Sequence, residues 1–355
     1  MARIVVAGAG AVGASVAYHL ALLGARNVVL ADAGQIAGGS TGKAMGGVRQ
    51  QFSTAAEVHL ARESIRFFEG LGPDYFQQVG YLFVATTETG LADLEARREL
   101  QVGLGVPVES VDPEQVRELA PGTNVQDVLG GAFCASDGVA DPPTVTRELV
   151  RRAAEHGVEV REATRADEVD ADTIVIACGA WSAKVAAGLG VDLPIRPLCR
   201  QLLETAPLKS LPEDLPMVIE TETGFHYRRR DDCLRIAMPD PGPRWGFEEN
   251  VDESLFDDRL TRLAHRFPAT SGARVARAWA GLYDMTPDAH PIVDRIGDGL
   301  FAVCGFSGHG FMQSPAVGRA LAEWIVEGAP SLDLTPYRLD RFEGATAVDV
   351  EAVVL

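Results

Sequence analysis

Three glycines near the start of the chain have a spacing that could hold a dinucleotide. Gly8, Gly10 and Gly13 spell GxGxxG: the first glycine allows a tight turn, the second lets the backbone approach a pyrophosphate, and the third lets a helix pack against a strand. Asp32 stands 19 residues after Gly13, where a carboxylate would accept a hydrogen bond from a ribose hydroxyl. This acid disfavours the 2′-phosphate of NADP, and both NAD and FAD remain.

A second glycine-rich stretch, "GFSGHGFMQSP" at residues 305–315, places His309 among glycines and apolar residues. The preceding residues 300–304 predict a strand, and the following ones predict an amphipathic helix because their apolar positions recur at helical spacing. The N–H groups at that helix start would stabilise negative charge on a ligand. We expect His309 to be either a neighbour of the ligand or a hydrogen-bonded loop histidine. The apolar positions of the helix are Val317, Leu321, Trp324 and Ile325.

The elements predicted around the first motif also favour a large cofactor. A β-branched strand precedes the glycines, a helix runs to Gly24, and a second strand, "NVVLAD", ends on Asp32. Residues 34–51 are rich in glycine and small polar residues, where a simple NAD domain would continue to alternate strands and helices. Such a loop is either a wrap around an extended cofactor or a mobile surface loop. "DTIVIACGAWS" at residues 172–182 predicts a buried strand that runs into a third close turn.

Composition limits the remaining classes of function. The 355 residues are 46% apolar, which suits one large or two interlocked domains, and no apolar run reaches the length of a spanning helix, roughly 18 residues. The five cysteines form no CxxC pair, so we expect neither disulfides nor a zinc site, and a cytoplasmic location. The net charge of −18 disfavours nucleic acid or an anionic membrane as a partner.

Five motifs together resemble a known family. The opening glycines, "GGSTG", "DTIVIACGAWS", "GLYDMTPDAHPIV" and "GFSGHGFMQSPAVGRALAEWI" are similar to those of FAD-dependent amine and amino-acid oxidoreductases of the D-amino acid oxidase family, in its sarcosine oxidase, glycine oxidase and proline dehydrogenase branch. The resemblance implies FAD-dependent oxidation of the C–N bond of a small amine or amino acid. A hydride equivalent would pass from the substrate to flavin N5, and the resulting imine would hydrolyse.

The predicted fold combines α/β and α+β parts. Short alternating runs in residues 196–280, separated by Pro, Gly and Asp, predict an antiparallel sheet. We therefore expect a doubly wound Rossmann-type FAD-binding domain joined to an antiparallel-sheet substrate domain. The FAD-binding domain would comprise residues 1–80, 130–195 and 280–345, the substrate domain residues 81–129 and 196–279, and residues 346–355 would form a tail.

These motifs and the resemblance predict three groups of site residues. Tyr283 matches a tyrosine that lines the family's site, with core packing as the alternative. Arg235 falls where the sarcosine oxidases have a lysine that promotes oxygen reduction, with an exposed strand arginine as the alternative. The expected catalytic residues are Arg49, Arg235, Tyr283 and His309, and the expected substrate-binding residues are Gln51, His226, Tyr227 and Met312. The expected cofactor-binding residues are Gly8, Ala9, Gly10, Val12, Gly13, Asp32, Ala33, Gly39, Ser40, Thr41, Lys43, Gly47, Val48, Ala177, Gly179, Trp181, Gly305, Gly308, His309, Gly310, Phe311 and Met312.

Three positions depart from the sarcosine oxidase pattern. Gly281 replaces the cysteine that bonds the flavin, so we expect non-covalent FAD. Met312 and Phe52 replace the lysine and the arginine that bind the substrate carboxylate. Because a carboxylate without a cation is costly in an apolar pocket, either the substrate is a larger or more apolar amine, or another cation binds its carboxylate. The candidate cations are Arg49, Arg228 and Arg235.

Other functions remain as alternatives. The same chemistry could belong to an oxidase, or to a dehydrogenase that passes electrons to a partner subunit or a quinone. Loss of the lysine and the arginine also leaves open a non-catalytic FAD-binding structural or assembly protein. A nicotinamide dehydrogenase is less favoured, because the stretch at residues 305–315 and its helix would then have no role.

Overall fold

A six-stranded sheet forms around the strand that precedes the first glycine turn. The computed structural model describes residues 2–209, 211–343 and 349–355. Strand β1 (Ile4–Ala7) is buried along its whole length and pairs in parallel with β2 and β10, as its continuous β-branched run favours. The sheet order is β17 (Ile292–Gly297), β18 (Leu300–Cys304), β10 (Thr173–Ile176), β1, β2 (Val28–Ala31) and β9 (Glu159–Arg161), with β17 antiparallel to β18.

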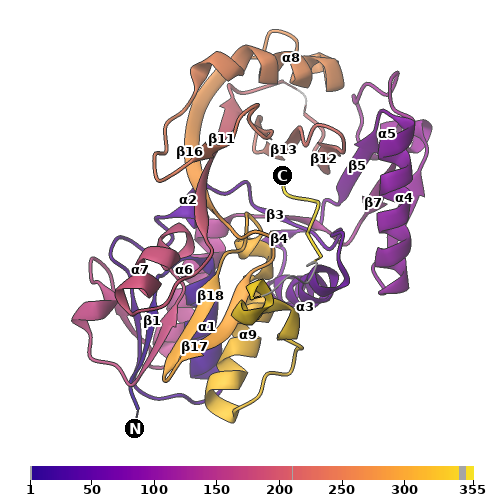
Figure 1. Ribbon diagram of the computed structural model, residues 1–355. Helices are drawn as coiled ribbons and strands as arrows, with labels where there is room; N and C mark the ends of the chain where they lie inside the picture. The colour runs from indigo at the N-terminus through magenta and orange to yellow at the C-terminus, as the bar shows by residue number, and fades with distance from the viewer. Residues whose placement is uncertain (1, 210, 344–348) are drawn as a thin grey trace.

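Helices cover both faces of this sheet (Figure 1). On one face, α1 (Ala11–Leu22) packs between α6 (Pro142–Glu155) and α9 (Gly310–Glu327), and α3 (Ala55–Leu71) packs against α9. A Cβ at Gly318 of α9 would lie 2.2 Å from Oγ of Ser15, so glycine permits the close approach of α9 to α1. The other face is covered by α7 (Ser182–Gly188). The helix and strand predicted around residues 305–315 are thereby confirmed as α9 and β18.

A nine-stranded sheet, mostly antiparallel, forms the second layer. Its apolar core packs against α5 (Pro113–Leu119) and α8 (Phe256–Arg266), while α4 (Glu88–Gly103) lies against β5 and β7. The predicted combination of a doubly wound sheet with an antiparallel sheet is confirmed. The strand order is β15 (Arg244–Trp245), β11 (Arg196–Thr205), β14 (Cys233–Ala237), β13 (His226–Arg230), β12 (Met217–Glu220), β5 (Tyr81–Ala85), β7 (Gly130–Cys134) and β6 (Val108–Val111), and β16 (Val275–Met285) pairs with β11.

The pairing of two strands differs from the predicted domain boundaries. Strand β7, which starts at the boundary predicted at residue 130, pairs with β5 and β6 in the nine-stranded sheet. Strand β16 continues in the same sheet to Met285, past the boundary predicted at residue 280. Because hydrogen-bonded strands belong to one sheet, we place the two boundaries after Cys134 and after Met285.

Shorter elements connect the two sheets. Residues 349–355, part of the predicted tail, lie between them, and Figure 1 shows this chain end in the middle of the molecule. Val353 is buried there in the same apolar cluster as Phe52 and Met217. The remaining elements are helix α2 (Ser40–Lys43), the small sheet β3 (Gly47–Val48), β8 (Gly138–Ala140) and β4 (Phe76–Gln77), and 3₁₀ turns at Ala166–Glu168, Gly179–Trp181, Glu253–Leu255, Pro268–Thr270, Thr335–Tyr337 and Leu339–Phe342.

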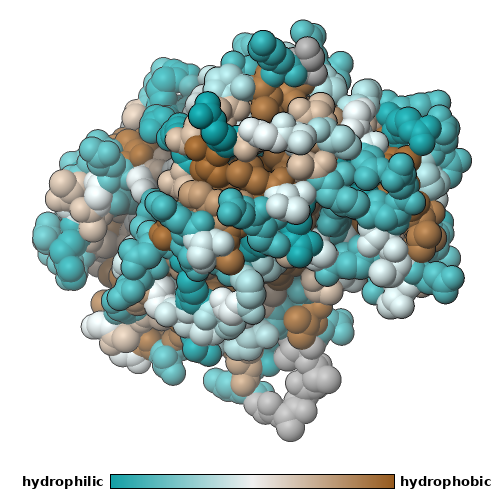
Figure 2. Space-filling model, turned by 90° about the horizontal axis from the view of Figure 1, so that it is seen from above, coloured by the Kyte–Doolittle hydropathy of each residue, from teal (hydrophilic) through white to brown (hydrophobic). Residues whose placement is uncertain are grey.

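The surface carries many hydrophilic residues (Figure 2), as the charged composition of the chain predicts. Hydrophilic residues dominate the face seen from above, with apolar residues gathered near its middle (Figure 2). Within the described part of the chain, no helix combines the length and the apolar character needed to cross a membrane. The same residues contain no group of three or more His, Cys, Asp or Glu side chains placed to hold a metal ion.

Candidate active site

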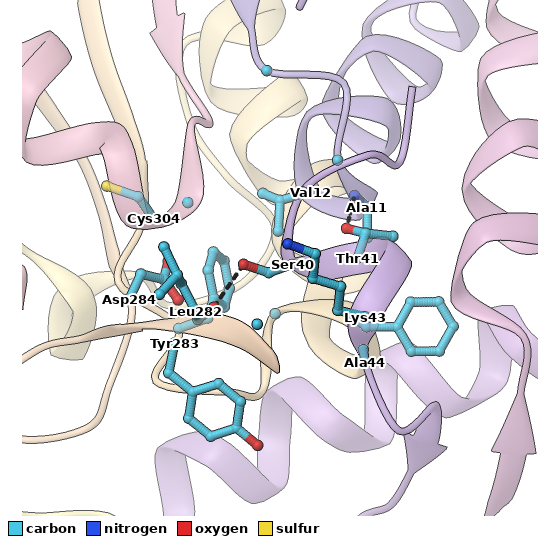
Figure 3. A pocket seen from close by; sticks show the side chains of 18 of the residues that line it. Ala11, Val12, Ser40, Thr41, Lys43, Ala44, Leu282, Tyr283, Asp284 and Cys304 are labelled. Atoms are coloured by element: carbon cyan, nitrogen blue, oxygen red, sulfur yellow. Dashed lines mark hydrogen bonds between the residues drawn. The ribbon is translucent and has the colours of Figure 1, made fainter. Parts of the chain in front are cut away.

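A cavity of about 980 Å³ lies between the two sheets. Its lining comes from the first glycine turn, the loop at residues 34–47, the turn after β10, the start of α9, and strands of the nine-stranded sheet. This volume is at the upper end of the typical range for small-molecule sites, about 300–1,000 Å³. Figure 3 shows Ser40, Thr41 and Lys43 on one side of the cavity and Tyr283 on another.

The first glycine turn has the geometry that its spacing predicts. Gly8 has a φ of +103°, and a Cβ there would lie 2.4 Å from the carbonyl oxygen of Ala177 on β10's turn. A Cβ at Gly13 would lie 1.8 Å from the Gly8 oxygen, so helix and strand pack too closely for any side chain. Asp32 accepts hydrogen bonds from the backbone N–H groups of Ala9 and Gly34, each at 2.7 Å, and also lines the cavity. The turn therefore forms a cradle of backbone at the start of α1.

The loop at residues 34–47 is fixed on both sides. Ser40 donates from Oγ to the Leu282 carbonyl oxygen at 2.6 Å, and Thr41 Oγ1 accepts from Ala11 N–H at 3.0 Å (Figure 3). A Cβ at Gly47 would lie 1.5 Å from the hydroxyl oxygen of Tyr81. The loop thus joins the start of α1 to β16, as a wrapping loop would and a mobile surface loop would not.

The start of α9 points free backbone donors toward the cavity. His309 is the N-cap residue, its side chain makes no capping hydrogen bond, and no other side chain of the described residues accepts from the first N–H groups of the helix. Gly308 has a φ of +97°, and a Cβ there would lie 2.5 Å from the ring of Tyr283. Gly308, His309, Gly310 and Phe311 all line the cavity. A ligand with negative charge would be stabilised at this end, because the helix dipole is positive there.

His309 is a buried, neutral histidine. Burial, reinforced by the nearby charge of Arg49, holds the pKa of His309 well below its usual value. Its Nε2 lies 3.2 Å from the Val353 carbonyl oxygen and 3.4 Å from Nη2 of Arg49. Its Nδ1 is buried without a hydrogen-bond partner among the described residues. A buried polar atom without a partner is uncommon, so this nitrogen fits contact with a bound group.

Arg49 lies at the same end of the cavity and is already hydrogen-bonded. Its guanidinium donates to the carbonyl oxygen of Gln51 and, at 2.6 Å, to that of Val353, and it stacks 4.0 Å from the Phe52 ring centroid. Burial lowers the pKa of Arg49, and the charge of Glu351 opposes that shift. Arg49 is therefore a cation whose donors are largely used by the protein itself.

Tyr283 and His226 face the cavity from the nine-stranded sheet. Tyr283 donates from its hydroxyl to the Leu355 carbonyl oxygen at 2.8 Å. His226 Nδ1 lies 2.8 Å from the Gly224 carbonyl oxygen, which can only accept, so Nδ1 carries the proton and Nε2 has a free lone pair. Burial lowers the pKa of His226 to about 4. His226 is therefore a neutral acceptor at the cavity wall.

Three of the predicted catalytic or substrate-binding residues do not line the cavity. Tyr227 packs in the apolar core on the opposite face of the sheet, because neighbouring strand residues face opposite ways. Gln51 is buried behind Arg49 and donates to Asp137 at 3.2 Å. Arg235 forms an ion pair with Glu204 at 3.0 Å and stacks on Trp279. These three side chains therefore lie outside the lining of this cavity, contrary to what their predicted roles require.

Four predicted cofactor contacts also lie outside the lining. Ala9 and Gly13 shape the first turn, Val48 is buried in the core, and Gly305 donates its N–H to Asp284 at 2.7 Å. They support the cavity wall from behind. The structure places the other predicted cofactor residues in the lining: Gly8, Gly10, Val12, Asp32, Ala33, Gly39, Ser40, Thr41, Lys43, Gly47, Ala177, Gly179, Trp181, Gly308, His309, Gly310, Phe311 and Met312.

Several lining residues were not expected from the sequence. Arg200 on β11, Met217 on β12 and Tyr81 on β5 all reach the cavity, as does Leu355. A cation inside the apolar strand "PLCRQLLET" was the one local signal for Arg200. Its place at the cavity depends on the pairing of β11 with β16, which no short stretch of sequence specifies.

The cysteines at the cavity are poor nucleophiles. Cys178 and Cys304 line it, and Gly281 stands where the family pattern has a flavin-bonding cysteine. Burial raises the pKa of the Cys178 thiol to about 12 and raises that of Cys304 as well. Both thiols therefore stay protonated near neutral pH, which makes them unreactive.

The chain is similar to a solved structure and to two proteins compared by sequence. The chain is 28% identical to L-proline dehydrogenase from P. horikoshii, with a TM-score of 0.89 over 96% of this chain and 98% of that one. It is 26% identical to 4-methylaminobutanoate oxidase (formaldehyde-forming) of Paenarthrobacter nicotinovorans over 96% of this chain but only 46% of the relative. It is 29% identical to FAD-dependent oxidoreductase domain-containing protein 1 of Xenopus laevis, again over 96% of this chain and over 82% of the relative. The chain thus spans less than half of the 4-methylaminobutanoate oxidase.

The family model of the FAD-dependent oxidoreductases called DAO matches residues 3–324. This range includes the first glycine turn, the wrapping loop, β16 and most of α9, which are the elements that build the cavity. The cradle at the first turn and the unpartnered Nδ1 of His309 are compatible with the cofactor of this family. The chain therefore belongs to the DAO family of FAD-dependent oxidoreductases.

Proposed function

We propose that the protein binds FAD non-covalently and oxidises the C–N bond of a small amino acid or amine, giving an imine that hydrolyses. One observation carries the proposal: a single cavity joins the dinucleotide turn at Gly8 to the start of α9 and to polar groups of the nine-stranded sheet. Bound FAD would accept a hydride equivalent from the substrate carbon. The protein's own residues would bind both molecules, orient the substrate and exclude water.

Different residues would hold the two ends of the cofactor. The backbone at Gly8 and Gly10 would face the pyrophosphate, and Asp32 would accept a ribose hydroxyl. The free N–H groups at the start of α9 would stabilise the negative charge that the flavin ring gains on reduction. Non-covalent binding is supported by Gly281 and by the raised pKa of the Cys178 and Cys304 thiols.

The substrate side contains a neutral base and few free cations. His226, held neutral by burial, offers Nε2 as an acceptor for a proton of a substrate ammonium group. Proline and 4-methylaminobutanoate, named for two relatives, each contain a secondary amine and a carboxylate. A secondary amino acid is therefore the substrate class that we propose, and glycine-like and sarcosine-like compounds belong to the same test.

Anaerobic absorbance of the FAD-loaded protein tests this function. Prompt bleaching of the visible flavin bands by L-proline, D-proline, sarcosine, glycine or another member of an amine panel would support it and identify the substrate. Reoxidation on admission of air would indicate an oxidase. Slow reoxidation of the flavin in air would indicate a dehydrogenase that passes electrons to a partner or a quinone. Flavin bands that no amine bleaches would favour the non-catalytic alternative, and failure to bind FAD would reject the proposal.

A further inference from the structure

Arg200 places a positive charge in the cavity beside Tyr283. Strand β11 pairs with β16 so that Arg200 lies opposite Gly281 and Leu198 opposite Tyr283. Residues directly opposite in paired strands share a face, as do residues two apart on one strand. Arg200, Gly281 and Tyr283 accordingly all line the cavity. Because Gly281 has no side chain, the residue directly opposite Arg200 does not cover its guanidinium.

Among the described residues, this guanidinium has no counter-charge: Arg200 forms no ion pair and no side-chain hydrogen bond, and its Nε is buried without a partner. Its Cζ lies 5.9 Å from the centroid of the Tyr283 ring. The charge of Arg200 also opposes the effect of burial on the pKa of Tyr283. A half-buried cation with an unsatisfied donor is costly unless a ligand supplies the acceptor.

The other cations of the cavity already have partners. Arg49 donates to the carbonyl oxygens of Gln51 and Val353 and stacks on Phe52. Met312, where the family pattern has a lysine, adds no charge. The three remaining lining cations are also engaged: Lys43 by Glu249, Arg165 by Asp167, and Lys184 by the ring of Phe247.

We propose that Arg200 binds the carboxylate of the substrate and thereby selects amino acids over simple amines. The planar guanidinium of arginine matches the two oxygens of a carboxylate, and the hydroxyl of Tyr283 lies on the same face of the sheet. The proposal rests on the proposed function, since it names the residue that recognises the substrate of that site. Arg200 on β11 would supply the carboxylate-binding positive charge that Met312 and Phe52 lack.

The test compares a carboxylate with its neutral isostere in the FAD-loaded protein. Calorimetry would measure binding of cyclopentanecarboxylate and cyclopentanecarboxamide to the wild type and to the Arg200→Met, Arg200→Lys and Arg196→Met variants. Arg196 is the matched control, because it is an exposed arginine on the same strand that stacks on Trp245. We expect Arg200→Met to weaken carboxylate binding about 10- to 100-fold, Arg200→Lys to restore part of it, and Arg196→Met to change nothing.

Comparing cyclopentanecarboxylate with cyclopentanecarboxamide distinguishes loss of the Arg200 charge from a general disruption of the cavity. Equal weakening of both ligands in Arg200→Met, or unchanged carboxylate binding, would overturn the assignment, as would a wild type that binds no carboxylate. Melting temperature and FAD content would show that the variant is folded. Bleaching by pyrrolidine as readily as by proline would reject the role of Arg200 while the proposed oxidation stands. Arg200-dependent carboxylate binding without any bleaching would support Arg200 and reject the oxidation.

Discussion

Burial makes the histidines of the cavity neutral acceptors instead of cations. Near neutral pH an exposed histidine is partly charged, but His226 and His309 both have a lowered pKa because the charged form is costly to bury. Two arginines, Arg49 and Arg200, also repel the charged form of His226. A substrate ammonium group entering this cavity would therefore meet lone pairs that can accept its proton.

Replacing His226 by Gln tests this charge state through stability. The folded state holds the pKa at about 4 against 6.5 in the unfolded chain, so the unfolded chain binds more protons between these pH values. This contribution of His226 to stability is therefore lost as pH falls from 6.5 toward 4, by up to about 3 kcal/mol. Urea unfolding at several pH values should show that the wild type loses more stability than His226→Gln in this window. The same pH dependence of the unfolding free energy in both proteins would contradict the prediction.

Gly308 tests how closely the start of α9 packs on the site. Alanine there would be strained by the positive φ, and its Cβ would lie 2.5 Å from the Tyr283 ring. Gly328 is the control, because it has a φ of +88° and open space where a Cβ would lie. Alanine at this position would suffer the backbone strain without a steric clash. We expect Gly328→Ala to cost about 1–2 kcal/mol with ligand binding intact. Gly308→Ala should also weaken cyclopentanecarboxylate binding in calorimetry, and equal binding by both variants would contradict this.

At the scale of elements, residues 349–355 cover the polar groups of Arg49 and Tyr283 at the cavity. Glu351 is buried and accepts from Ser53 N–H at 3.0 Å and from Val353 N–H at 2.9 Å. This anchor places the carbonyl oxygens of Val353 and Leu355 on Arg49 and Tyr283. A carboxylate that binds at the Tyr283 hydroxyl must displace the Leu355 carbonyl oxygen, so the segment and the ligand compete for the same donor.

Glu351→Ala should release this segment. Without the carboxylate, two backbone N–H groups lose their acceptor, and we expect hydrogen exchange in residues 349–355 to accelerate about 10-fold or more. Association of cyclopentanecarboxylate should become faster for the same reason. Asp349→Ala, at an exposed position of the same segment, is the control. Exchange that stays as slow in Glu351→Ala as in the control would show that Glu351 is no anchor.

Local patterns predicted some elements well and others only in part. The glycines and apolar spacing around residues 300–325 sufficed for β18 and α9, because turn and helix preferences act over short distances. Strand alternation implies that His226 and Tyr227 face opposite ways, but not which of them faces the cavity. Arg200 and residues 349–355 reach the site through contacts distant in sequence, such as β11 with β16, so no local pattern could place them.

At the scale of the whole molecule, one cavity connects two sheets that have separate apolar cores. The first glycine turn belongs to the six-stranded sheet, whereas Arg200 and Tyr283 belong to the nine-stranded one. A ligand that fills the cavity contacts both, so its binding energy stabilises the two sheets together. At a free FAD concentration 100 times the Kd, the gain in unfolding free energy would be about 2.7 kcal/mol.

Hydrogen exchange with and without FAD tests whether the cofactor spans both sheets. We expect protection at residues 8–13 and, at the same FAD concentration, at the start of α9 and in β16, because these two elements of the proposed flavin end lie more than 260 residues along the chain from the first turn. Helix α5 lies outside the lining and should show no direct protection. Protection confined to the first turn would mean that only the adenosine half is held, and it would reject the assignment of the flavin to the start of α9. Protection at both ends would place the reacting ring beside Tyr283, within reach of a substrate bound to Arg200.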